Sequence, residues 1–302
     1  MIEDFFGIIG QERTLDAAYN HLKHNRSIIF SGPQGCGKSA MIAASAQIMS
    51  ERRVQSYPMV IPFCHPLKQF TLALVEKLHR RKLLEQEFLS QDFDTLRKRL
   101  NREHYRFTVQ LILKSFHNYP GIFVGIDDLD ALTPTGRSII LELANSGAIL
   151  CAAYTKKTAT LKRVVYQFQE IHVPPLHDNT VKKIAAAFIN ERGLLVEDRE
   201  HFIENIAWKS AGNPLALDNL LKYFENQPHI RTEDVRGLSQ GAGRKETSLE
   251  WIIYAMFGIM IMLRFVSRAT MNKQLYIITS AIVAFFVILR YFMARGNRSE
   301  TA

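Results

Sequence analysis

The stretch that decides the fold is SIIFSGPQGCGKSAM, residues 27–41 of the 302-residue chain. It opens with a short apolar run that predicts a buried strand, and the apolar residues at its end predict the start of a helix. Between them, a glycine-rich loop fits the spacing G-x-x-x-x-G-K-[ST] with the residues Gly32, Pro33, Gln34, Gly35, Cys36, Gly37, Lys38 and Ser39. Because strand, loop and helix follow in the order that this motif requires, we predict a phosphate-binding loop; a chance glycine turn is the alternative.

The residue types in this loop match the chemistry of phosphate binding. Glycines let the backbone wrap closely, so that its N–H groups converge on phosphate oxygens. The helix that begins near Lys38 and includes Ala40 adds its positive dipole end. Lys38 is expected to reach the β- and γ-phosphates, and the Ser39 hydroxyl to ligate Mg²⁺.

A second apolar run, GIFVGIDDLD at residues 121–130, ends in carboxylates. A strand that ends in this way would place Asp127 beside the phosphates, where it can hold Mg²⁺ through water. Asp128 is the next carboxylate and is the candidate for orienting the attacking water. An ordinary strand with acidic residues in its exit turn is the alternative.

Strand and helix patterns alternate through residue 175, which predicts a three-layer αβα domain with a parallel sheet. A further apolar strand is followed by Thr155, our candidate for sensing the γ-phosphate, with Lys156 as the back-up. A simple strand cap is the alternative role for Thr155. Among the helices, the periodicity predicts one over 67–83 and another over 96–116.

After residue 175 only helical periodicity remains, and a polar, glycine-containing segment follows it. The sequence therefore predicts five parts: an αβα domain at 1–175, a helical lid domain at 176–229, a linker at 230–249, a two-helix membrane hairpin at 250–295 and a cytoplasmic tail at 296–302.

The hairpin is predicted from two apolar stretches, 251–266 and 275–289. Each is slightly shorter than the ~20 residues that a bilayer crossing needs, but each becomes long enough if Arg264 or Arg290 snorkels toward the headgroups. The chain would contact lipid through 251–293, with both termini on the cytoplasmic side of the cell (inner) membrane. Two buried helices of a soluble domain, or an oligomer interface, are the alternatives.

The composition limits the classes of partner. The formal net charge is +9, and Lys and Arg outnumber Asp and Glu in the apolar C-terminal part, which favours a membrane surface over a nucleic-acid groove. Basic and aromatic residues do not interleave as in single-strand binding proteins, so nucleic acid is not implied. The three cysteines are too few and too scattered for a disulfide framework or a zinc site, and they fit a reducing compartment.

Together, the loop, the acidic strand and the helical segment resemble the AAA+ and STAND group of P-loop ATPases over roughly residues 5–228. FGIIGQE at 6–12 is similar to the AAA+ segment that packs on adenine, with Ile8 and Ile9 in the contacting positions. SAGNPLAL at 210–217 resembles the G-x-P-L-A-L signature of STAND proteins, in which the proline, here Pro214, closes over the adenine. The resemblance implies ATP and Mg²⁺ as ligands and a homo-oligomer.

The sequence also departs from this family pattern. The AAA+ arginine of the second sensor, expected near Pro214, is absent, and Gln167 stands where a trans-acting arginine finger is expected. Arg163 is the nearest substitute, and Asp128 is shorter than the usual glutamate. Because such a finger contributes ~10³-fold or more to hydrolysis, these departures predict a slow ATPase.

The first functional hypothesis is therefore a membrane-anchored ATPase that acts as a nucleotide-dependent oligomerisation switch. A motor or assembly ATPase of a membrane or secretion machine is the second, and a non-hydrolysing ATP-binding scaffold is the third. A role in handling DNA would rest on fold analogy alone. The sequence does not identify a protein partner.

Overall fold

The computed structural model describes residues 9–52, 56–225, 227, 229–236 and 262. The chain divides into two units, Met1–Arg244 and Lys245–Ala302, and nearly all the described residues belong to the first. The predicted hairpin at 250–295, apart from Met262, and the predicted tail at 296–302 lie outside the described residues. Within the part of the chain that is described, no helix has the length and apolar composition needed to cross a membrane.

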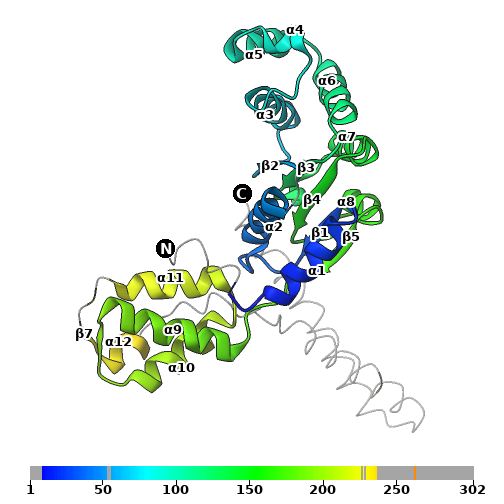
Figure 1. Cartoon of the computed structure of the whole chain (residues 1–302). Helices are drawn as coiled ribbons and strands as arrows, with labels where there is room; N and C mark the ends of the chain where they lie inside the picture. The colour runs from blue at the N-terminus through cyan, green and yellow to red at the C-terminus, as the bar shows by residue number, and fades with distance from the viewer. Residues whose placement is uncertain (1–8, 53–55, 226, 228, 237–261, 263–302) are drawn as a thin grey trace, which may run out of the picture. The chain divides into compact units, whose positions relative to one another are not determined.

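The centre of the first unit is a parallel sheet of five strands, as the alternating pattern predicts (Figure 1). The strands lie in the order β2-β3-β4-β1-β5. Their bounds are β1 (Ile28–Ser31), β2 (Tyr57–Ile61), β3 (Ile122–Ile126), β4 (Ile149–Tyr154) and β5 (Gln169–His172). Parallel pairing requires a crossover between successive strands, and each of these crossovers contains at least one helix.

Helices cover both faces of the sheet, because successive strand residues point to opposite sides. Ile28 and Phe30 of β1 pack in the core beneath α1 (Glu12–Leu22) and α2 (Lys38–Arg52). Ile29 between them packs in a larger core on the other face. That core lies under α3 (Leu67–Arg80), α6 (Tyr105–Asn118), α7 (Pro134–Asn145) and α8 (Ala159–Val165).

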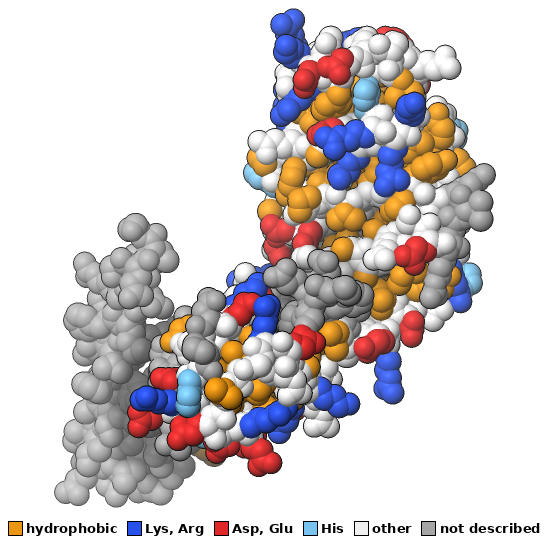
Figure 2. Space-filling model, turned by 60° about the vertical axis from the view of Figure 1, so that its left-hand side comes forward, with side chains coloured by type: hydrophobic (Ala, Val, Ile, Leu, Met, Phe, Trp, Pro, Cys, Tyr) orange, Lys and Arg blue, Asp and Glu red, His pale blue; other side chains and the backbone are white. Residues whose placement is uncertain are grey.

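Four helices, not two, connect β2 to β3. The helix predicted over 96–116 is wrong as a single element, because α5 (Phe93–Arg102) ends and α6 begins at Tyr105. Between them Glu103 and His104 are extended, and the His104 ring accepts a hydrogen bond from the backbone N–H of Arg106. Short α4 (Gln86–Leu89) precedes α5. In Figure 2, Lys and Arg side chains gather over the part of the surface formed by α3–α6.

The helical segment that follows has a core of its own. Its helices are α9 (Asp178–Arg192), α10 (Arg199–Ser210), α11 (Pro214–Glu225) and α12 (Thr232–Arg236), joined by the short parallel pair β6 (Leu195–Val196) and β7 (His229–Ile230). The boundary predicted at 229/230 falls within this packed region. Ile230 and Val235 are buried in this core, so the folded helical region continues to Arg236 and uses the first residues of the predicted linker.

The burial of the cysteines gives a test of this fold. Cys36, Cys64 and Cys151 are all buried and form no disulfide. Loss of solvation raises the pKa of the Cys36 and Cys151 thiols and raises that of Cys64 to about 11. We expect the folded protein to react with a chromogenic disulfide reagent at least ~10-fold more slowly than the unfolded chain, because little thiolate is present or accessible. One thiol that reacts at the unfolded rate would contradict this packing.

Candidate functional site

The predicted phosphate-binding loop connects β1 to α2, which begins at Lys38. Gly35 and Gly37 have φ angles of 78° and 94°, in the left-handed region that favours glycine. At Gly35 an added Cβ would lie 2.6 Å from the side-chain oxygen of Asn213 and 2.9 Å from the Cβ of Leu215. The loop therefore needs glycine at position 35 both for its backbone angle and for the close approach of α11.

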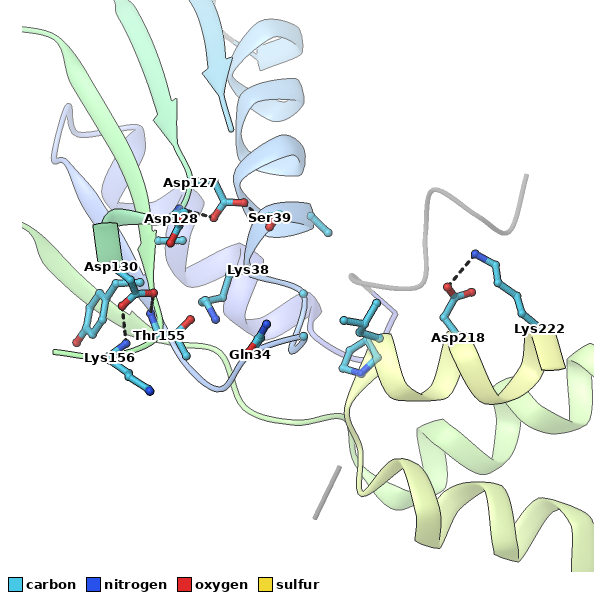
Figure 3. A pocket seen from close by; sticks show the side chains of 17 residues that line it. Gln34, Lys38, Ser39, Asp127, Asp128, Asp130, Thr155, Lys156, Asp218 and Lys222 are labelled. Carbon is cyan, nitrogen blue, oxygen red and sulfur yellow. Dashed lines mark hydrogen bonds and ion pairs between the residues drawn. The ribbon is translucent and has the colours of Figure 1, made fainter. Parts of the chain in front are cut away.

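Lys38 and Ser39, the first two residues of α2, lie beside the loop and carry the polar groups expected of a phosphate site (Figure 3). The buried Lys38 ammonium donates to the carbonyls of Gly32 at 2.9 Å and Pro33 at 2.7 Å, which holds it over the loop. The Ser39 hydroxyl donates to the carboxylate of Asp127, which follows β3. The structure thus brings together the two residues predicted to hold Mg²⁺.

These oxygens suit a magnesium ion. A hydroxyl and a carboxylate are the hard ligands that Mg²⁺ takes from proteins, and the ion usually obtains its other ligands from phosphates and water. The other carboxylate oxygen of Asp127 accepts a hydrogen bond from the backbone N–H of Asp128 at 2.9 Å, which fixes its orientation. Among the described residues, no group of three or more His, Cys, Asp or Glu side chains could hold a metal by itself.

The acidic turn after β3 continues with two further carboxylates. Asp128 is exposed and left-handed, with φ 53° and ψ 56°, and its carbonyl accepts from the Cys64 thiol at 3.1 Å. Asp130 lies in the short helix η1 (Leu129–Ala131) and accepts from the backbone N–H groups of Thr155 at 2.8 Å and Lys156 at 2.6 Å. We did not predict this role for Asp130, although the third acidic residue of DDLD was a visible signal. It fixes the backbone of the candidate sensor Thr155.

A neutral tyrosine borders the same site. The Tyr154 hydroxyl donates to the carboxylate of Glu170, which also pairs with Lys157 at 3.0 Å. Burial, reinforced by Glu170, raises the pKa of Tyr154 to about 12, and the hydrogen bond from Tyr154 lowers the pKa of Glu170. Tyr154 therefore stays protonated at neutral pH, and its hydroxyl hydrogen is held by Glu170 at the end of β4.

The loop, the acidic turn after β3 and the end of β4 line a pocket of about 790 Å³, a size typical of small-molecule sites. Of the predicted residues, the following line it: Gln34, Gly35, Gly37, Lys38, Ser39, Ala40, Asp127, Asp128, Thr155, the back-up Lys156 and Pro214. The helical region contributes Leu215, Asp218 and Lys222 besides Pro214, and Asp218 pairs with Lys222 at 2.9 Å (Figure 3). The predicted site residues Gly32, Pro33 and Cys36 are not among the pocket-lining residues.

The predicted adenine-contacting segment is described only in part. Ile8 lies outside the described residues, and Ile9 is 37% exposed and is not among the pocket-lining residues. Among the described residues of this segment, 9–12, the buried one is Gln11, which we did not predict. Its side-chain amide donates to the carbonyl of Cys36 in the loop at 3.2 Å and to that of Pro174 at 2.9 Å. Gln11 thereby ties the N-terminal segment to both the loop and the entry to the helical region.

Comparisons with known proteins give distant likenesses of fold. No protein-family model matches the sequence, and no curated protein matches it. Domain III of the Thermotoga maritima replication initiation protein DnaA is 16% identical, with a TM-score of 0.48 over 78% of this chain and 93% of that one. The RuvB Holliday junction branch migration motor of T. maritima is 15% identical, with a TM-score of 0.48 over 83% of this chain and 77% of that one. C. elegans PCH-2 is 15% identical, with a TM-score of 0.44 over 74% and 65%.

The fold and the site define a class: a parallel-sheet α/β protein with a phosphate-loop motif at the carboxyl edge of its sheet. At these identities and TM-scores the likenesses do not decide a family within that class.

Asp130 offers a test of how the site is assembled. Asp130→Asn keeps the side-chain size but leaves one oxygen for two backbone donors, so we expect a loss of ~1–3 kcal/mol in unfolding free energy. Urea unfolding followed by circular dichroism measures it. The matched control is Asp94→Asn on α5. Asp94 is exposed, and its carboxylate makes no hydrogen bond or ion pair with the described residues, so this change should alter stability by less than ~0.5 kcal/mol. Equal stability of the two variants would contradict the role assigned to Asp130.

Proposed function

We propose that this chain is a P-loop ATPase of the AAA+ type that binds ATP with Mg²⁺ and hydrolyses it slowly. The observation that carries the proposal is the convergence of Lys38, Ser39 and Asp127 on one pocket from two different elements. Such a combination of ammonium, hydroxyl and carboxylate beside a glycine-rich loop suits a nucleoside triphosphate and its metal. An uncharged ligand would not require this combination of charged and polar groups.

Each residue then has a defined task. Lys38 would leave the loop carbonyls to contact the β- and γ-phosphates, while Ser39 and Asp127 would hold the metal. The metal, when bound, neutralises charge on the phosphate oxygens. Asp128 orients a water whose oxygen attacks the γ-phosphorus as the bond to the β–γ bridging oxygen breaks, which gives ADP and phosphate. Thr155, held by Asp130, lies where it can report the γ-phosphate.

Slow turnover follows from what borders the site. From α11 the pocket is lined by Pro214, Leu215 and the paired Asp218 and Lys222, so no arginine of the described α11 residues faces the phosphates. Gln167 and Arg163 are both exposed at the end of α8, beside Tyr166, which is 86% exposed. This exposed segment suits contact with a second copy of the chain. Arg163 is then the one candidate there for a trans-acting finger.

The cellular setting is proposed from the sequence. The hairpin at 250–295 would anchor the ATPase in the cell membrane, with the nucleotide site in the cytoplasm. ATP-dependent assembly would then gather hairpins in the bilayer, and the energy available equals the difference in ATP affinity between the two states. A motor of a membrane or secretion machine, which needs steady turnover, and a non-hydrolysing scaffold are the competing functions.

Steady-state hydrolysis separates these functions. We expect the full chain in lipid vesicles to release phosphate from ATP at well below ~1 s⁻¹, the lower end of ordinary enzyme turnover. Lys38→Ala should abolish this activity, because the loop loses its contact with the phosphates. Turnover above that rate that falls sharply in Arg163→Ala would favour the motor, and no turnover despite tight ATP binding would favour the scaffold.

The metal site has its own test. Ser39→Ala and Asp127→Asn should each weaken binding of a fluorescent ATP analogue by ~10–100-fold in Mg²⁺, because each removes a group that holds the ion or its water. The effect should be much smaller in EDTA. Ser138→Ala, an exposed serine of α7 outside the pocket, serves as the matched control. Wild-type affinity of both variants in Mg²⁺ would show that the ion is not held here.

A further inference from the structure

Asn213 contacts the phosphate loop from the helical region. It directly precedes α11, and its side-chain NH₂ donates to the carbonyl of Gln34 at 2.8 Å. The next turn of chain adds a second contact, because the backbone N–H of Leu215 donates to the carbonyl of Gly35 at 3.2 Å. Two successive loop carbonyls are therefore held by residues about 180 positions away in the sequence.

The other end of the same side chain starts α11. The Asn213 oxygen accepts from the backbone N–H groups of Leu215 at 3.0 Å and Ala216 at 3.2 Å, as a helix N-cap does. If the amide were flipped, its oxygen would face the Gln34 carbonyl and its NH₂ would face the N–H groups of Leu215 and Ala216. These hydrogen bonds therefore determine the orientation of the amide. One amide thus performs two separable tasks: its oxygen caps α11, and its nitrogen holds the loop.

Close packing on both sides holds this contact in place. Gly35 in the loop admits the Asn213 oxygen only because it has no side chain. Gly212, before Asn213, has a φ of 74°, and an added Cβ there would lie 2.3 Å from the carbonyl of Leu176. The backbone N–H of Leu176 in turn donates to the Gly212 carbonyl at 2.7 Å. Asn213 is therefore anchored to the start of the helical region as well as to the loop.

Because a peptide unit is planar, the contact at the Gln34 carbonyl also sets the direction of the Gly35 N–H. In a trans peptide the C=O and the following N–H point in opposite directions. Holding the Gln34 carbonyl toward Asn213 therefore turns the Gly35 N–H away from it. The orientation of an amide in the loop thus depends on a residue of the helical region.

We propose that Asn213 is the positioning residue that couples the helical region to nucleotide in the loop. This rests on the proposed ATP binding. Phosphate engaging the loop amides favours the peptide orientation that Asn213 holds, and the same contact fixes where α11 starts. ATP would then tighten the helical region onto the loop through an amide–backbone hydrogen bond.

Asn213→Ser separates the two tasks, because serine caps a helix well but is too short to reach Gln34. Without nucleotide, the variant should melt within ~4 °C of the wild type. It should bind the fluorescent ATP analogue ~5- to 10-fold more weakly, as expected for the loss of one hydrogen bond. At saturating Mg²⁺–ATP, the protection from proteolysis that ATP gives residues 178–236 of the wild-type chain should be lost.

Asn219→Ser is the matched control, since Asn219 is exposed on the same helix and its side chain makes no hydrogen bond within the described part of the chain; it should behave as wild type. Asn213→Asp is the second variant. It keeps the cap but sets an oxygen against the Gln34 carbonyl, so at saturating ATP it should also lose the protection even if the serine variant folds poorly.

The outcomes separate the two proposals. If the wild-type chain binds no ATP, the proposed function itself fails. If the wild type binds ATP but both Asn213 variants retain its affinity and its protection, the coupling role is wrong and ATP binding stands. A variant that only melts at a lower temperature, with full ATP protection, would reduce Asn213 to a structural cap and overturn the inference.

Discussion

The contact between the Ser39 hydroxyl and the Asp127 carboxylate depends on parallel pairing of the sheet. Parallel strands all end at the same edge, so the residues that follow β1 and β3 meet there although they lie far apart in the chain. Because β1 and β3 are not neighbours but flank β4, their strand axes lie ~10 Å apart. Side chains from the two exits close that gap above the end of β4, where the pocket lies.

The strand order also explains the role of Asp130. Its turn follows β3, which pairs directly with β4, so its carboxylate reaches the backbone that leaves β4 at Thr155 and Lys156. Had β3 lain beside β1, the same carboxylate would face the phosphate loop instead. The order β3-β4-β1 therefore assigns the Asp127 carboxylate to Ser39 and the Asp130 carboxylate to the exit of β4. The two aspartate carboxylates therefore have different partners only because of where they lie in the turn.

The sequence predicted the elements whose signals are local. An apolar run followed at once by glycines or carboxylates identifies the loop and the β3 exit within a few residues, and parallel topology then requires them to meet. It did not predict the partners of Asp130, Gln11 and Asn213, because these depend on strand order and on distant segments. The break between α5 and α6 at Glu103 was not predicted, because the helical periodicity of apolar residues continues across it. The burial of Ile230 was not predicted, because a single apolar residue among polar neighbours gives no periodic pattern.

The phosphate loop is shaped largely from outside itself. Three successive carbonyls accept hydrogen bonds from other segments: Gln11 holds that of Cys36, Asn213 that of Gln34, and the start of α11 that of Gly35. A glycine-rich loop has little conformational preference of its own, so these donors reduce the entropy lost when its amides align on an anion. One donor precedes the sheet and two follow it. The helical region therefore helps to fix the conformation of the loop.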